Sequence, residues 1–115
     1  MIKIKRVYEK PANDDGWRVL VDRLWPRGMK KEATRVDVWM RDVAPSDALR
    51  KWFGHEPEKW SEFQKRYRSE LAKKKDMVAE LKKMEMEHRI LTLLFGAKDE
   101  DHNQAVVLAN MLKAR

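Results

Sequence analysis

Four stretches of the chain carry the apolar patterns of β-strands. Residues 2–7 alternate apolar with basic side chains, which predicts a strand with one face on the core. Residues 17–22 have an almost unbroken, β-branched apolar centre that predicts burial on both faces, and residues 90–95 form the most apolar run, typical of a central strand. Residues 36–43 alternate as well and predict a further strand.

Sequence patterns typical of helices occupy the chain between the strands predicted at residues 36–43 and 90–95. Ser46 is a natural N-cap for a short helix over residues 47–53, and Gly54 suits a left-handed residue at its end. Pro57 suits the first position of a longer helix. The inner face of that helix is predicted from apolar residues spaced three, four and four apart: Trp60, Phe63, Tyr67 and Leu71.

Two more helices are predicted towards the C-terminus. The lysines at 73–75 suit the end of the long helix, and Asp76 can cap the next one. The residues of that next helix expected to face inward are Met77, Leu81 and Met84. The acidic residues at 99–101 suit the opening of the last helix. Its expected inner face is Ala105, Leu108, Ala109 and Leu112.

Strands separated by helical segments imply crossover connections and hence parallel pairing. We therefore expect an α/β fold, in which residues 1–115 form a single compact domain with a small, mostly parallel sheet flanked by helices. A length of 115 residues suits one domain with one core.

The composition narrows the classes of chemistry. The chain has no cysteine, which excludes disulfides, thiolate metal sites and cysteine nucleophiles, and we expect a cytoplasmic location. No run approaches the roughly 20 apolar residues of a membrane span, so no membrane partner is expected. The net charge of +7 allows binding to nucleic acid, but 19 acidic residues among 26 basic ones also fit a solvated surface of mixed sign.

Polar residues follow the two most apolar strands. Ligands of open parallel sheets bind outside the carboxyl ends of the strands, so these two segments are expected to share one edge. Asp22 follows three aliphatic residues, and Arg23 or Arg27 is its expected partner. Such a pair can hold a phosphate or a carboxylate, and it is equally well explained as a structural salt bridge.

The second segment adds a histidine. His102 is expected at the beginning of the last helix, where the dipole favours its neutral form, so it is a candidate acid or base together with Asp22. A capping or surface role explains it equally well. Trp25 is a candidate pocket wall or stacking platform. The remaining candidate ligand-binding residues are Arg23, Arg27, Gly28, Lys98, Asp99 and Asn103.

Other candidates have simpler explanations. His55 is expected as a loop histidine packed on Trp52, and the N-cap role accounts for Ser46. His55, His102, Asp22 and Asp99 have no metal-binding spacing, and no phosphate loop or dinucleotide fingerprint occurs, so no metal and no cofactor are expected.

Three motifs carry a resemblance to a known family. They are Val19-Leu20-Val21-Asp22-Arg23-Leu24-Trp25-Pro26-Arg27-Gly28, Ala44-Pro45-Ser46 followed by Leu49-Arg50-Lys51-Trp52-Phe53-Gly54-His55, and Leu91 to Asp99 continuing through His102-Asn103 to Leu108. With these motifs the chain resembles the YeaO-like branch of domain-of-unknown-function family 488 over nearly its whole length. The resemblance implies a compact α/β domain and no established activity. Longer relatives show a Cys-His-Arg-like element near the last helix, where this chain reads Asp101-His102-Asn103 without the cysteine.

Three functional hypotheses follow. The favoured one is a domain that binds, or acts on, a small anionic ligand at the carboxyl ends of the strands. The alternatives are a basic nucleic-acid-binding module that uses Trp25, and a protein-interaction subunit that meets a partner or a second copy. The first is favoured because polar residues gather at the strand ends, whereas the charge is dispersed along the chain.

Overall fold

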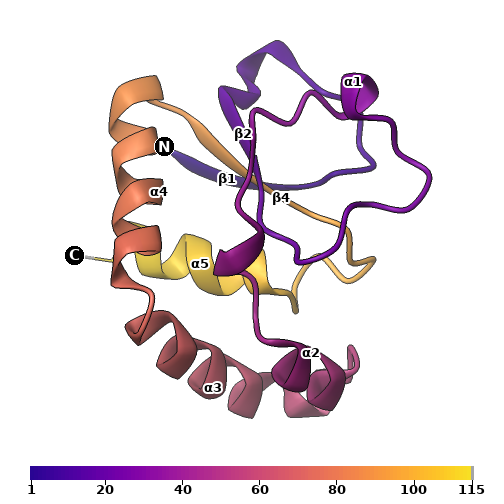
Figure 1. The fold of residues 1–115 in the computed structure, drawn as a ribbon, viewed down its shortest axis with the longest axis vertical. Helices are drawn as coiled ribbons and strands as arrows, with labels where there is room; N and C mark the ends of the chain where they lie inside the picture. The colour runs from indigo at the N-terminus through magenta and orange to yellow at the C-terminus, as the bar shows by residue number, and fades with distance from the viewer. Residues whose placement is uncertain (115) are drawn as a thin grey trace.

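The most apolar run of the sequence is the centre of the sheet. In the computed structural model, which describes residues 1–114, strand β4 (Leu91–Phe95) lies between β1 and β2 and is parallel to both (Figure 1). All five of its residues are buried. The expected α/β fold with a parallel sheet is confirmed, and the strand order is β1-β4-β2-β3.

The elements agree with most of the expected segments. The other strands are β1 (Ile2–Arg6), β2 (Trp17–Leu20) and β3 (Val38–Trp39). The α-helices are α1 (Lys31–Thr34), α2 (Asp47–Phe53), α3 (Trp60–Ala72), α4 (Lys75–His88) and α5 (Gln104–Lys113). Short 3-10 turns stand at Asn13–Asp15, Arg41–Val43 and Pro57–Lys59.

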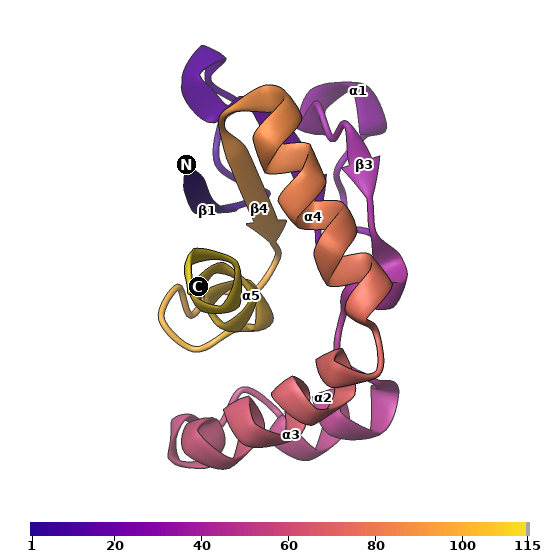
Figure 2. The same ribbon diagram turned by 90° about the vertical axis from the view of Figure 1, so that its left-hand side faces the viewer.

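The two faces of the sheet are covered differently. Side chains alternate along β4, and Leu91, Leu93 and Phe95 pack into the main core with residues of the helices. Leu94 points to the other face, into a small cluster with Val7 and Leu20 that Trp25 and Val36 cover. Helices α4 and α5 contact each other and both contact β4, so the helical layer lies on one face (Figure 2). A long loop covers the other.

The helices α2 and α3 lie beyond the carboxyl end of β4 (Figure 2). Ser46 caps α2 as expected, accepting the amide of Leu49 at 3.1 Å, and its hydroxyl donates to Glu70 of α3 at 2.6 Å. Tyr67 of α3 is buried, and its hydroxyl donates to the carbonyl of Val43 at 2.7 Å. These bonds tie the helical pair to the chain that leaves the sheet.

A buried ion pair lies at the start of β2. Arg18 is 3% exposed, and its guanidinium donates to the carboxylate of Asp15, which is 4% exposed. Lys5 of β1 also donates to Asp15, at 3.1 Å, and Arg18 donates to the carbonyl of Thr34 at 2.7 Å. The pattern of residues 17–22 did not predict this charged side chain inside an apolar strand.

Several predicted boundaries are wrong, and the strand predicted over residues 17–22 already ends at Leu20. The strand expected at residues 36–43 is only two residues long, because the chain turns into a 3-10 helix at Arg41. The long helix expected from Pro57 begins as a 3-10 turn and becomes α-helical at Trp60. Asp76 does not cap α4, since the N-cap is Lys74, whose ammonium group instead donates to the carbonyls of Asp42 and Ala44.

The last helix also begins later than expected. The side chain of Asp99 accepts the amides of Asp101 and His102, at 2.9 and 3.1 Å, and so closes a turn. Asn103 is the N-cap, accepting the amide of Val106 at 3.2 Å, and α5 starts at Gln104. Within the described residues, no helix is long and apolar enough to cross a membrane.

Candidate functional site

Asp22 and Gly96 meet at one edge of the sheet. β2 and β4 are neighbours with Leu20 opposite Leu94, and the two chains leave the sheet side by side. The amide of Gly96 donates to Oδ2 of Asp22 at 2.8 Å. A Cβ atom at position 96 would lie 2.9 Å from the same oxygen, so an alanine there would displace the Asp22 carboxylate from this position. The expectation that the two strand ends share an edge is confirmed.

A cavity of about 250 Å³ opens at this edge. Its walls come from the segments after β2 and β4, from the chain before α2, and from α2, α3 and α5. Apolar side chains form much of the lining, and seven side chains can form hydrogen bonds. The polar members are Asp22, Arg23, Arg50, His55, His102, Asn103 and Gln104. The apolar members are Leu24, Ala44, Pro45, Phe53, Phe63 and Ala97, with Gly96 beside them.

Among residues 1–114, Asp22 has no arginine partner, contrary to the expected pairing with Arg23 or Arg27. Its second oxygen, Oδ1, accepts a hydrogen bond from the side-chain amide of Gln104 instead. The guanidinium of Arg23 turns away to the chain before α2. Burial raises the pKa of Asp22 to about 6, and the hydrogen bonds from Gly96 and Gln104 offset only part of that rise.

The raised pKa gives Asp22 a pH-dependent effect on stability. The folded state binds its proton more tightly than the unfolded state, so the contribution of Asp22 falls as pH rises from 3.8 to about 6 and is constant above that. In Asp22→Asn, Oδ1 can accept from Gly96 and Nδ2 can donate to Gln104 after its amide flips. The unfolding free energy of the variant relative to the parent is therefore expected to increase by about 2–3 kcal/mol across this pH range. Urea denaturation at several pH values measures it, and a difference that does not change with pH would contradict the assignment.

Two arginines stand at the cavity. Nε of Arg23 donates to the carbonyl of Pro45 at 3.1 Å, and Nη2 lies 3.4 Å from the carbonyl of Ala44, which fixes the guanidinium. Arg50 reaches the cavity from α2. Asp47 lies between the two, 3.8 Å from Nε of Arg23 and 3.4 Å from Nη2 of Arg50. Each guanidinium retains free N–H donors, because it carries five.

His102 is held by Asp99. Nδ1 of its ring lies 2.9 Å from the carboxylate of Asp99, and the ring packs edge-on against Trp60 with centroids 5.2 Å apart. The hydrogen bond from His102 lowers the pKa of Asp99. His102 stands before the N-cap of α5 and not within the helix, which corrects its expected position. Its Nε2 atom makes no hydrogen bond to the described residues.

Asn103 lies in the lining, but its polar atoms are committed to the fold. Its side-chain oxygen caps α5, and its Nδ2 donates to the carbonyl of Asp99 at 3.0 Å. Only 2% of Asn103 is exposed. The structure therefore explains Asn103 as a capping residue, and a role in ligand binding stays a prediction.

Trp25, Arg27, Gly28 and Lys98 lie outside the lining. The ring nitrogen of Trp25 donates to the carbonyl of Met29 at 2.8 Å, and the ring packs edge-on against Trp39 with centroids 5.4 Å apart. The carbonyl of Arg27 accepts the hydroxyl of Tyr8 at 3.1 Å, and its side chain is exposed, as is Lys98. Gly28 has a φ of +79° in an open turn. Trp25 thus closes its own loop and does not face the cavity.

Sequence reasoning missed Arg50, Gln104 and a role for His55 at the cavity. His55 lies in the lining with its ring 6.3 Å from that of Phe53, whereas Trp52, its expected neighbour, packs against Lys59 and Arg66. Arg50 lies one residue after the buried Leu49, and Gln104 directly after the N-cap. These positions could have been found only by placing the two helices against the strand ends.

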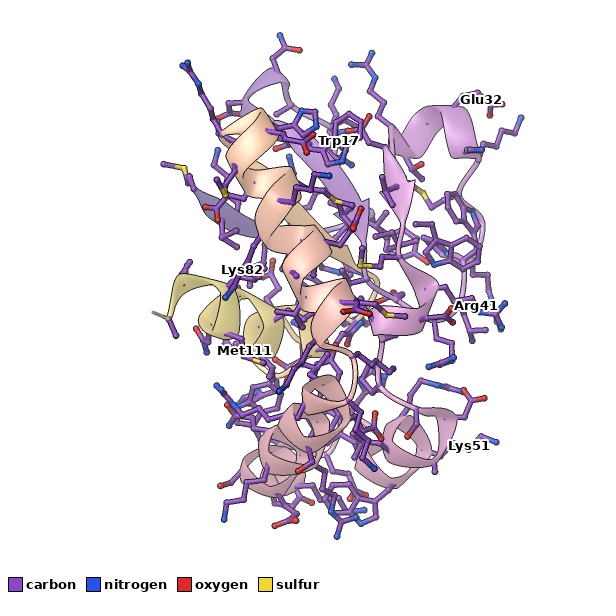
Figure 3. All side chains as sticks on the ribbon, turned by 60° about the vertical axis from the view of Figure 1, so that its left-hand side comes forward. Trp17, Glu32, Arg41, Lys51, Lys82 and Met111 are labelled. Carbon is purple, nitrogen blue, oxygen red and sulfur yellow. The ribbon has the colours of Figure 1, made fainter. Side chains whose placement is uncertain are left out.

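Charged side chains outside the cavity lie on several separate elements. No group of three or more His, Asp or Glu side chains in residues 1–114 could hold a metal ion. The basic side chains are spread over separate elements, as Figure 3 shows for Arg41 before α2, Lys51 on α2 and Lys82 on α4.

Uncharacterised bacterial proteins are similar to the chain over its whole length. The uncharacterised protein Rv3073c of Mycobacterium tuberculosis is 42% identical over 114 residues, which cover 99% of this chain and 95% of that protein. The uncharacterised protein YeaO of Escherichia coli is 41% identical over 116 residues, covering 98% and 97%. No solved structure gave a significant match. The family model described as the inactive DUF488-N3 subclade matches residues 1–115.

Proposed function

Because the chain belongs to this inactive DUF488-N3 subclade, we propose that it is a cytoplasmic binding domain that holds a small anionic ligand in the cavity at the strand ends. The description of the subclade as inactive favours binding over catalysis, and a chain without cysteine has no thiol nucleophile. The ligand class is the one favoured from the sequence, but Arg50, and not Arg27, is the arginine that binds the anion together with Arg23.

One observation carries the proposal: two guanidinium groups reach an apolar-walled cavity. Arg23 is fixed by two carbonyls and is 19% exposed, so its orientation is set before a ligand arrives. Arg50 is more exposed, at 44%, and is free to adjust. The planar fork of a guanidinium matches the two oxygens of a carboxylate or phosphate, and it binds them more strongly where apolar walls exclude water.

Two guanidinium groups and one carboxylate leave this part of the cavity with a net positive charge, which favours the binding of one anion. Asp47 is the only acid within 4 Å of either guanidinium among the described residues, and 63% of it is exposed. Its distances of 3.8 and 3.4 Å are longer than those of a well-formed charged hydrogen bond. A ligand oxygen can therefore join or displace Asp47 at little cost.

Ligand-induced stabilisation tests the proposal. Melting temperatures are measured with inorganic phosphate, with straight-chain carboxylates and with benzoate, at constant ionic strength. A ligand at one hundred times its Kd should stabilise the parent by about 2.7 kcal/mol, which corresponds to a rise in melting temperature of about 10 °C. In Arg50→Ala this stabilisation should fall sharply, because one of the two guanidinium groups that bind the anion is gone.

Arg27→Ala is the matched control. Its side chain is an exposed arginine outside the cavity, so the variant should keep the full stabilisation. Equal responses of the parent and both variants, or loss in Arg27→Ala with retention in Arg50→Ala, would reject this cavity as the anion site.

A further inference from the structure

Asp22 is a carboxylate at the cavity with no positively charged partner in the part of the chain that the structure describes. No lysine, arginine or histidine among the described residues lies within 4 Å of it, and its two oxygens accept only from the neutral donors Gly96 and Gln104. Burying an acid without a cation is unfavourable. The fold nevertheless holds this side chain in a fixed position at the cavity wall, where neither bond uses all the lone pairs of the carboxylate.

Gln104 adds a second acceptor at the same wall. Its side-chain nitrogen is committed to Asp22, which leaves its Oε1 atom without a hydrogen bond to the described residues. This wall therefore offers acceptors, whereas Arg23 and Arg50 offer donors elsewhere in the same lining. Phe53, Phe63 and the other apolar residues of the lining complete the cavity.

We propose that the ligand is a small hydroxy- or amino-carboxylate: its carboxylate binds Arg23 and Arg50, and its hydroxyl or amino group donates to Asp22 and Gln104. This inference rests on the proposed function and names the class of ligand within it. The part of the ligand between the two groups is hydrocarbon, since the rest of the lining is largely apolar. An acid without the second group leaves the acceptors of Asp22 and Gln104 unmatched, and buried unmatched polar groups discriminate strongly between ligands.

The test compares matched acids by isothermal titration calorimetry. The probes are straight-chain carboxylates of three to six carbons, each measured plain, with a terminal hydroxyl and with a terminal amine. At the length that spans the cavity, a substituted acid is expected to bind about tenfold more tightly than the plain acid of equal length. The hydroxyl and amine series distinguish the two forms of the donor.

Asp22→Asn removes the charge and should bring the ratio of Kd values for the substituted and plain acids close to one. Asp76→Asn, an exposed acid on α4, is the matched control and should keep the ratio. If Asp22→Asn does not fold, Gln104→Met removes the second acceptor and should lower the ratio.

The outcomes separate this inference from the proposed function. Plain acids that bind through Arg50 as tightly as the substituted ones would overturn the inference and leave the proposed function standing. A preference that persists in Asp22→Asn would also overturn it. No binding of any acid, plain or substituted, would overturn both.

Discussion

Replacing Asp15 with alanine is expected to lower the free energy of unfolding by about 3–5 kcal/mol, because it leaves a buried guanidinium without its anion. Arg18 is almost fully buried beneath the loop that covers the second face of the sheet, and Thr34 and Arg35 would supply only carbonyls. Burial by itself would raise the pKa of Asp15, but the Ala12 amide, Lys5 and Arg18 lower it overall. The carboxylate is therefore held in its charged form.

Asp14→Ala is the control for this prediction. The neighbouring Asp14 pairs with Lys3 at 3.5 Å but is 77% exposed, and exposed pairs contribute about 0–1 kcal/mol. Urea denaturation followed by tryptophan fluorescence gives both unfolding free energies. Similar losses in the two variants would mean that the buried pair contributes no more than a surface pair.

Gly16→Ala is expected to cost about 3 kcal/mol or more. Gly16 has φ +65° and ψ −135°, a region that residues with a side chain rarely adopt. An added Cβ would also lie 2.6 Å from the Cβ of Ile90 and closer still to the Ile90 carbonyl. That carbonyl accepts the amide of Trp17 at 2.9 Å, so it cannot move without loosening the start of β2. Backbone strain and steric overlap therefore add.

Gly28→Ala separates the two contributions. Gly28 has φ +79°, but an added Cβ would meet nothing within 4 Å, so only the backbone strain of about 1 kcal/mol remains. Thermal unfolding of both variants, together with the parent, measures the difference. If both substitutions lower the free energy of unfolding by the same amount, the contact with Ile90 does not contribute to the effect at position 16.

The fold was predictable where one pattern repeats over several residues. The apolar run at 90–95 forms the central strand. The helical spacing of Trp60, Phe63, Tyr67 and Leu71 correctly predicted helix α3, in which the last three of these residues are buried. Ser46 and Gly54 marked the ends of α2, because capping depends on residues close together in the chain.

Boundaries set by tertiary contacts were not predictable. Acidic residues at 99–101 suit a helix start, but Asp99 closes a turn with the amides of Asp101 and His102 instead. Lys74 occupies the N-cap position of α4 without a capping side chain, and its ammonium group binds carbonyls of the chain before α2. Local preference does not reveal which of two competing hydrogen bonds the assembled protein makes.

The location of the candidate site was partly predictable. Topology places Asp22 and the segment after β4 together, since parallel neighbours end at the same edge. Arg50 and Gln104 come from helices whose orientation cannot be predicted from local sequence. Arg27 is close to Asp22 in sequence, but its side chain lies outside the cavity. The choice among arginines therefore needed three-dimensional structure.

The position of β4 has a consequence for how the chain acquires its structure. β1 and β2 do not pair with each other, because the strand that joins them comes from residues 91–95. During synthesis β1 stays without a partner strand until that late segment emerges, while β2 can pair only with the two-residue strand β3, and residue 2 then meets residue 91. We expect a nascent chain that stops before β4 to contain helices and at most the short β2–β3 pair, and the four-stranded sheet to assemble in a single late step.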